Sequence, residues 1–295
     1  MNESDAAVFA YRAEKAEKYA SVLKEERLHG IYVKGAVRTK TAGYVDFCVY
    51  RPVEAPQGRL PVVFSFHGGG FVLGFYEADG KYCQRLADAT GCAVVNVDYP
   101  LAPEFKYPKP PLATYEAVAG IVRRAAEWNL DPDRVFVLGH SAGGCIAADL
   151  CLLDRDRQEI GISGQILDYA PLRQTVSEEH RKVLDASKAI KHERVLQYLG
   201  WYFENSAQLD EPLASPATAD LHDLPDTLVI SAEYDSLAGE EEEFARRAAE
   251  AGTAVTREVF LGCQHGFTHE EFKEHQPVQA ARAWELMASF IRERL

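Results

Sequence analysis

Residues 139–143 have the types and spacing that make a serine hydroxyl reactive. Ser141 is the centre of Gly-His-Ser-Ala-Gly, between the apolar run 135–138 and the small-residue run 145–148. Small residues two positions before and after a serine let a helix begin close to a strand, so that the hydroxyl projects above a sheet edge. The pattern predicts a nucleophile on a strand–turn–helix unit. Taken alone, it also fits an ordinary glycine-rich turn.

A serine hydroxyl needs a base to remove its proton and a carboxylate to orient that base. Asp235 and His265 each follow a strand-like stretch in the C-terminal third of the chain. Because the carboxyl ends of parallel strands meet at one sheet edge, we expect both residues to join Ser141, as orienting acid and as base. Glu233 stays a rival for the acid, since it lies two residues before Asp235.

Three glycines follow His67 directly after an apolar stretch at 60–66. Glycines leave backbone N–H groups unshielded by side chains and free to converge on one point, as an oxyanion hole requires. A plain flexible loop is the alternative; a phosphate-binding loop is disfavoured because no Gly-Lys-Ser/Thr follows. Phe71 and its bulky successors should limit the room for an acyl group, which favours acyl chains of about two to six carbons.

The bulk composition narrows the class of protein. The chain has 295 residues, a hydrophobic fraction of 47% and a net charge of −13. This acidity argues against nucleic acid or an anionic membrane as a partner, and no long uncharged run is present to span a bilayer. The first residues lack the pattern of a signal peptide, so we expect a cytoplasmic protein.

The cysteines indicate free thiols. Six are present, none of them in a Cys-x-x-Cys pair, and most lie in apolar segments. Buried thiols in a reducing compartment are the expected state, and we expect no metal and no cofactor.

Strand and helix patterns alternate along most of the chain. We predict strands at 31–37, 44–50, 60–66, 93–97, 135–138, 162–167, 227–231 and 254–260, and helices at 5–28, 77–90, 112–128, 239–251 and 277–294. This alternation is typical of a single α/β domain with a parallel sheet and helices on both faces. The first helix should bury a stripe formed by Phe9, Ala13, Ala16, Ala20 and Leu23.

The alternation breaks at 172–215, where no strand pattern occurs. An insertion above the carboxyl ends of a parallel sheet lies where a lid would sit. Its segment 191–204 carries Tyr198, Trp201 and Tyr202, for which we predict substrate contacts, as for Phe71. An ordinary crossover with core aromatic residues is the alternative.

Taken together, these motifs resemble a known family. They are His67-Gly-Gly-Gly, Asp98-Tyr with Leu101-Ala-Pro-Glu104, Gly139-His-Ser-Ala-Gly-Gly144, Asp235 and His265-Gly-Phe267. In this order, over about 60–270, the chain is similar to the hormone-sensitive-lipase-like carboxylesterases of the α/β-hydrolase superfamily. It departs from them at His140, where the family has Asp or Thr, and at Ser236, where Pro is common.

The resemblance implies a fold and a set of roles. It implies an α/β-hydrolase fold with an eight-stranded, mostly parallel sheet and a helical cap contributed by about 1–30 and 172–215. Ser141, Asp235 and His265 would be the catalytic residues, with an oxyanion hole formed by the N–H groups of Gly69, Gly70 and Ala142. Glu104 would hold a loop near the site.

We therefore expect a serine carboxylesterase that hydrolyses small, short-acyl esters through an acyl-enzyme. A deacetylase of sugar or xenobiotic esters, or a peptidase with the same triad, is one alternative. A non-catalytic ligand-binding relative is another, but its mark would be a lost histidine, and His265 is present. The expected partner is a small-molecule ester, without nucleic acid or membrane insertion. The oligomeric state is open, a homodimer included.

Overall fold

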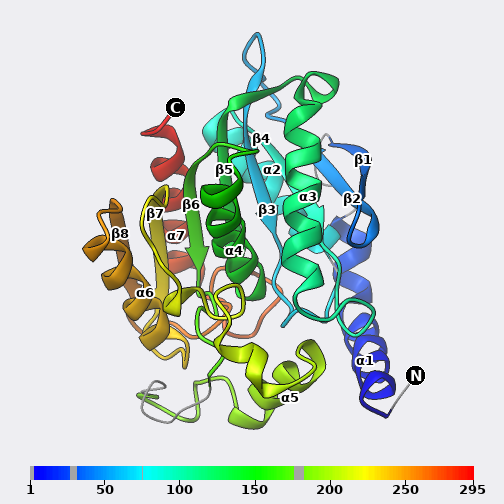
Figure 1. Cartoon of the computed structure of the whole chain (residues 1–295), viewed down its shortest axis with the longest axis vertical. Coiled ribbons are helices and arrows are strands. Elements are labelled where there is room, and N and C mark those ends of the chain that lie inside the picture. Colours follow the sequence, from blue (N-terminus) through cyan, green and yellow to red (C-terminus); the bar gives the residue numbers. More distant parts are fainter. Residues whose placement is uncertain (1–2, 27–31, 75, 176–182) are drawn as a thin grey trace.

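An eight-stranded sheet is the centre of the molecule (Figure 1), and the computed structural model describes residues 3–26, 32–74, 76–175 and 183–295. The strands are β1 (Tyr32–Thr39), β2 (Gly43–Tyr50), β3 (Leu60–Phe66), β4 (Ala93–Asp98), β5 (Leu130–His140), β6 (Ile162–Asp168), β7 (Asp226–Ala232) and β8 (Val255–Phe260). Their order is β1-β2-β4-β3-β5-β6-β7-β8. β2 is antiparallel to both of its neighbours, β1 and β4, and all other neighbouring strands are parallel, so the predicted mostly parallel sheet is confirmed.

The central strands need cover on both faces because their side chains are apolar in both directions. Every residue of β3 is buried, and so are the first five of β4. Continuous apolar runs of this kind are typical of parallel strands sandwiched between helices. The edge strand β8 differs, since most of its residues are only half-buried.

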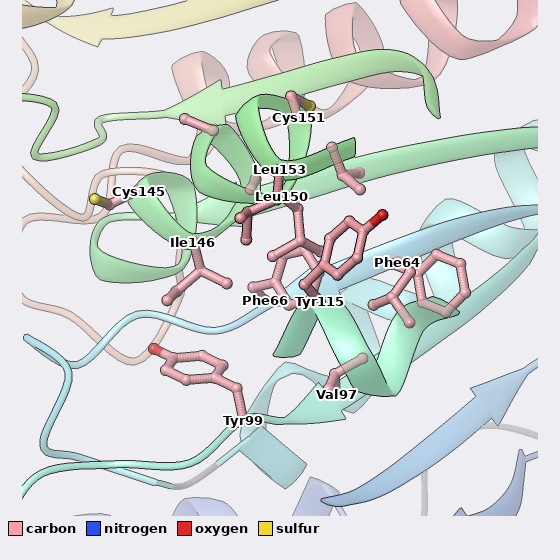
Figure 2. Packing of buried hydrophobic residues seen from close by; sticks show 14 of the residues in the cluster. Phe64, Phe66, Val97, Tyr99, Tyr115, Cys145, Ile146, Leu150, Cys151 and Leu153 are labelled. Atoms are coloured by element: carbon pink, nitrogen blue, oxygen red, sulfur yellow. The ribbon is translucent and has the colours of Figure 1, made fainter. Parts of the chain in front are cut away.

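Five helices supply that cover. They are α2 (Gly80–Thr90), α3 (Lys109–Arg123), α4 (Ala142–Arg157), α6 (Ala238–Glu250) and α7 (Pro277–Arg292). Helices α3, α4 and α6 pack on one face, and α2 and α7 on the other (Figure 1). Figure 2 shows how Ile146 of α4, Phe66 of β3 and Tyr115 of α3 gather in the core of the first face.

Short 3₁₀ turns explain where helix boundaries differ from the predictions. They are η1 (Tyr76–Asp79), η2 (Ala125–Trp128), η3 (Ser206–Asp210) and η4 (Pro216–Thr218). The helix predicted at 112–128 is α3 followed by η2, and the one predicted at 77–90 is η1 followed by α2. None of the helices in the described part of the chain is both long enough and apolar enough to cross a membrane.

Two helices lie at the end of the sheet where the parallel strands finish. They are α1 (Glu3–Glu26) and α5 (His192–Tyr202), which contact each other (Figure 1). The expected cap spans 1–30 and 172–215, of which residues 1–2, 27–30 and 176–182 lie outside the described residues.

The predicted buried stripe of α1 is wrong. Val8 is fully buried, whereas Phe9 is 39% exposed and Ala13 is exposed; the side chains of Ala20 and Leu23 lie outside the described residues. Alanine buries little area, so its spacing says little about which side of a helix docks. The docking side of α1 is instead defined by polar and aromatic contacts at the site.

Candidate active site

The turn between β5 and α4 has the strained geometry that its sequence predicts. Ser141 has φ 52° and ψ −121°, which is an unfavourable conformation for a residue with a side chain. A Cβ atom at Gly139 would lie 1.9 Å from the Gly143 carbonyl oxygen, and one at Gly143 would lie 2.1 Å from that of Phe66. The close approach of strand and helix therefore requires glycine at both positions.

A hydrogen-bonded chain links three side chains at the carboxyl edge of the sheet. The Ser141 hydroxyl lies 2.9 Å from His265 Nε2, and His265 Nδ1 lies 2.5 Å from Asp235 Oδ2. The other oxygen of Asp235 accepts a hydrogen bond from the Leu237 N–H at 3.1 Å. A carboxylate that accepts the Nδ1 proton leaves Nε2 with a lone pair facing the hydroxyl.

The rival carboxylate lies elsewhere. Glu233 Oε2 accepts a hydrogen bond from the Gly262 N–H at 2.6 Å and does not bond to His265. Of the two acids considered from the sequence, Asp235 is therefore the one that orients the histidine.

The environment favours protonation of His265. Burial by itself lowers the pKa of this imidazole, but the Asp235 carboxylate opposes it, and the net result is a pKa raised above 6.5. The Tyr169 ring packs edge-on against the imidazole, with ring centroids 4.8 Å apart. His265 is thus a base whose conjugate acid is stabilised by its neighbours.

The glycine loop after β3 lies beside Ser141. A Cβ at Gly68 would lie 3.5 Å from Ser141 Cβ, and Gly69 and Gly70 have φ values of 124° and 61°, a region that favours glycine. Among the described residues, no hydrogen bond uses the N–H of Gly69 or Gly70. Ala142 is the first residue of α4, so its N–H has no acceptor within the helix.

His67 holds the start of this loop as a neutral side chain. Its ring stacks on that of Tyr99 with centroids 4.3 Å apart, and the Tyr99 hydroxyl donates to the His67 carbonyl oxygen at 2.8 Å. Burial lowers the pKa of His67 to about 4. Its place is structural, because a stacked and buried neutral ring fixes the backbone direction before the glycines.

Helix α1 is attached to the same loop through one arginine. Arg12 donates to the Val72 carbonyl oxygen at 2.6 Å, to that of Ala102 at 2.5 Å and to the Glu104 carboxylate at 2.6 Å. Glu104 therefore helps to hold a loop near the site, as the resemblance implies. The sequence motif pointed to Glu104 as a residue that holds this loop. It did not point to Arg12, because the residues around Arg12 form no motif.

A cavity of about 560 Å³ opens over Ser141. Ser141, His265 and the glycine loop line it, together with Phe71, Leu73, Tyr198, Leu199 and Phe272. Tyr198 packs onto the loop so closely that a Cβ at Gly70 would lie 2.5 Å from its ring. Phe71 and Tyr198 are thus placed where a substrate would contact them.

Trp201 and Tyr202 correct part of the prediction for substrate contacts. Neither lines the cavity, and both are buried behind it. The Tyr202 ring stacks on that of Phe71 with centroids 4.1 Å apart, and Trp201 packs on Tyr11 at 5.3 Å. Side chains on the sheet-facing side of α5 support the cavity wall rather than form it.

A second histidine–aspartate pair lies next to the nucleophile, and sequence reasoning missed it. His140 Nδ1 lies 2.7 Å from Asp168 Oδ2, with both side chains buried. With His269 they form a set of donors that suits a metal ion. The Thr268 hydroxyl, however, lies 3.0 Å from Asp168 Oδ2 and 2.9 Å from His269 Nδ1, so these atoms already bond to it. The arrangement is a hydrogen-bond network. In the sequence, the position of the acidic Asp168 at a strand end could have indicated it.

Comparison with known proteins identifies the family. A family model described as alpha/beta hydrolase fold matches residues 63–269. The chain belongs to the α/β-hydrolase family. The resemblance drawn from its motifs, to the hormone-sensitive-lipase-like esterases of that family, is confirmed.

Relatives of this α/β hydrolase are esterases. An arylesterase of Saccharolobus solfataricus is 31% identical over 226 residues, which cover 74% of this chain and 71% of that protein. The carboxylesterase NlhH of Mycobacterium tuberculosis is 30% identical over 79% of this chain and 76% of its own length. An esterase structure from Pyrobaculum calidifontis has a TM-score of 0.89 at 30% identity, and covers 99% of this chain and 94% of that one. This α/β hydrolase is an enzyme of the carboxylesterase class.

Proposed function

We propose that the chain is a serine carboxylesterase that hydrolyses small, short-acyl esters, with Ser141 as nucleophile, His265 as general base and Asp235 as the acid that orients it. The observation that carries the proposal is the continuous hydrogen-bonded chain of these three side chains at a cavity. The rotamer of each is fixed by its partner, as a nucleophile and its base require. The esterases among the relatives support the same class of reaction.

In the first half of the reaction, His265 Nε2 takes the proton of Ser141 while Oγ attacks the ester carbonyl carbon. The carbonyl oxygen becomes an oxyanion, to which the N–H groups of Gly69, Gly70 and Ala142 would donate. The imidazolium then gives its proton to the departing alkoxide, so the alcohol leaves and the acyl group stays on Oγ. Asp235 stabilises the imidazolium throughout but does not take its proton.

In the second half, His265 removes a proton from water as the water oxygen attacks the acyl carbon. The second oxyanion forms at the same N–H groups and collapses with expulsion of the Ser141 oxygen, which recovers its proton from His265. A carboxylic acid leaves and the free enzyme is restored. No step requires a metal or a cofactor, so we expect a chelator such as EDTA to leave ester hydrolysis unchanged.

The walls of the cavity support a short acyl group. Phe71 is held by its stacking on Tyr202, and Tyr198 is held against Gly70. Both aromatic rings are therefore rigid obstacles beside the N–H groups that would bind the oxyanion. An acyl chain gains from burial only as far as a pocket receives it, by roughly 0.8 kcal/mol per methylene.

The Ser141→Ala variant tests the proposal. We expect a folded protein whose kcat/KM for 4-nitrophenyl acetate falls by about three orders of magnitude or more, because the nucleophile is gone. A fluorophosphonate should label Ser141 in the native chain. The matched control is Ser289→Ala on α7, whose hydroxyl bonds to Glu285 and Arg292 on the surface of that helix. Retained hydrolysis by Ser141→Ala, or labelling of another serine, would contradict the assignment.

The proposal also covers the compartment, the cap and the oligomeric state of the protein. All six cysteines are free and buried, which supports the reducing compartment expected from the sequence, the cytoplasm. The cap role of α1 and of 172–215 is supported by their place over the cavity, which Tyr11 of α1 and Tyr198 of α5 both line. A homodimer stays a prediction, which light scattering on the purified chain would test.

A further inference from the structure

The outer part of the cavity gathers basic side chains, although the chain as a whole has a net charge of −13. The basic residues that line it are Lys15, Lys188, Lys191, Arg194 and Lys273. Lys188, Lys191 and Arg194 lie on α5 or on the segment that leads into it. A local reversal of charge at the mouth of a substrate cavity points to the charge of what enters it.

The acids that line the cavity do not cancel these cations. Asp79 is buried, and burial raises its pKa to about 7, so it is only about half ionised near that pH. Glu271 is held by Lys81, which lies outside the lining. Glu274 lies 3.4 Å from Lys273, so that pair contributes no net charge. Lys15 and Lys188 have acidic partners as well, so Lys191 and Arg194 are the cations that leave the mouth positively charged.

Arg194 is the most informative of these residues. Its guanidinium lies 4.5 Å from the centroid of the Tyr11 ring and 5.8 Å from that of Tyr198. Among the described residues, neither Arg194 nor Lys191 forms an ion pair, whereas Lys15 and Lys188 have acidic partners. Burial of a charge is costly unless the charge finds a partner, and Arg194 is half-buried. Here the face of the guanidinium rests on aromatic rings, and its N–H edge stays available for a bidentate anion.

Arg194 lies close to the proposed reaction centre. Tyr198 lies between them: one side of this residue contacts Gly70, and the guanidinium of Arg194 lies near its ring. Only one aromatic side chain therefore separates the arginine from the loop that would bind the oxyanion. A ligand whose ester carbonyl lies at Ser141 can reach Arg194 with a group a short chain or one ring away.

We propose that the preferred substrates of this enzyme are esters that carry a carboxylate group, bound by Arg194 with the help of Lys191. The inference rests on the proposed function and adds a substrate class to it. The net charge of the protein repels anions at long range, so this preference arises from contact and not from steering.

Matched pairs of esters test the inference. One pair, 4-nitrophenyl hydrogen glutarate and its neutral methyl glutarate counterpart, places the charge on the acyl side; the other, 4-acetoxybenzoate and 4-acetoxybenzamide, places it on the alcohol side. We expect kcat/KM of the wild type to favour the carboxylate ester by about tenfold or more in one pair, as one charge-assisted bidentate contact supplies. Arg194→Gln should lower that ratio about tenfold, and Arg194→Lys should keep part of it.

The control is Arg123→Gln, which removes a cation from the far end of α3 and should change neither the ratio nor the neutral activity. A second measurement uses the wild type alone: free glutarate should inhibit hydrolysis of a neutral ester competitively, and glutaramide should not. A ratio near one in both pairs, or a preference that survives Arg194→Gln, overturns the inference. If the neutral esters are hydrolysed through Ser141, that result leaves the esterase proposal intact; if no ester is hydrolysed, the proposed function itself fails.

Discussion

Single residues determine the pH response of the proposed reaction, and His265 is the first of them. The base must be neutral, and the Asp235 carboxylate raises its pKa above the ordinary value of about 6.5 in spite of burial. We therefore expect kcat/KM to fall on the acid side of a midpoint above about pH 6.5, because protonated His265 cannot accept the serine proton. Initial rates with 4-nitrophenyl acetate between pH 5 and 9 would measure this midpoint. An unchanged rate down to about pH 5 would argue against a histidine base.

The same shift acts on stability with a definite sign. Because the folded chain binds the His265 proton more tightly than the unfolded chain does, this group stabilises the fold fully below about pH 6.5. Its contribution is lost as the pH rises through the folded pKa. Activity and this part of the stability thus change in opposite directions with pH.

The buried pair of His140 and Asp168 allows a comparison with a surface pair of the same type. His140 lies 2.7 Å from Asp168 in the interior, and His222 lies 2.6 Å from Asp220 in solvent. We expect His140→Ala to lower the free energy of unfolding on the order of 3 kcal/mol, because a buried carboxyl loses its partner. His222→Ala, the control, should leave the urea midpoint unchanged. Equal effects of the two substitutions would contradict this account.

At the scale of elements, helix α1 is attached directly to residues of the site. Arg12 bonds to Val72 beside the glycine loop, and the Tyr11 hydroxyl lies 2.9 Å from that of Tyr198. We expect removal of residues 1–28 to leave the sheet folded but to raise KM, since elements that cover sites belong to the least stable parts of a fold. Steady-state kinetics and thermal unfolding would measure both effects.

The point variant Arg12→Ala tests whether the contacts of Arg12, and not only the presence of helix α1, matter for substrate binding. It should raise KM in the same direction as the truncation, while the exposed substitution Glu17→Ala on the same helix should not. Loss of all folded structure on truncation would make α1 part of the core. Unchanged kinetics for every ester would place it outside the site.

At the scale of the molecule, the cavity limits the size of the ester that we propose as substrate. Its volume of about 560 Å³ is shared by the acyl group, the alcohol and water, and Phe71 and Tyr198 stand beside the glycine loop. We expect kcat/KM along a series of 4-nitrophenyl esters to peak at about two to six acyl carbons and to fall thereafter, as further methylenes find no pocket. A maximum at about twelve carbons would contradict the proposed short-acyl preference.

The sequence by itself determined the strands, their succession along the chain and the positions of the residues proposed as the catalytic triad. Apolar runs and small-residue spacings are local patterns, and they predicted all eight strands and the turn at Ser141. Chain order after successive parallel strands was enough to bring Asp235 and His265 to that turn, because such strands end at the same edge. The glycines at 68–70 likewise predicted a loop with exposed backbone N–H groups, because glycine has no side chain to cover them.

The tertiary structure alone decided which side chains face one another across long separations. Arg12, a residue with no local signature, anchors α1; Trp201 and Tyr202 support the cavity instead of lining it; His140 has Asp168 as its partner. Periodicity says that a helix has an apolar side but not what lies opposite it. The charge at the cavity mouth also depends on tertiary structure. Lys191 and Arg194 lie far along the chain from Tyr11, and they come close to it only when α1 and α5 pack together.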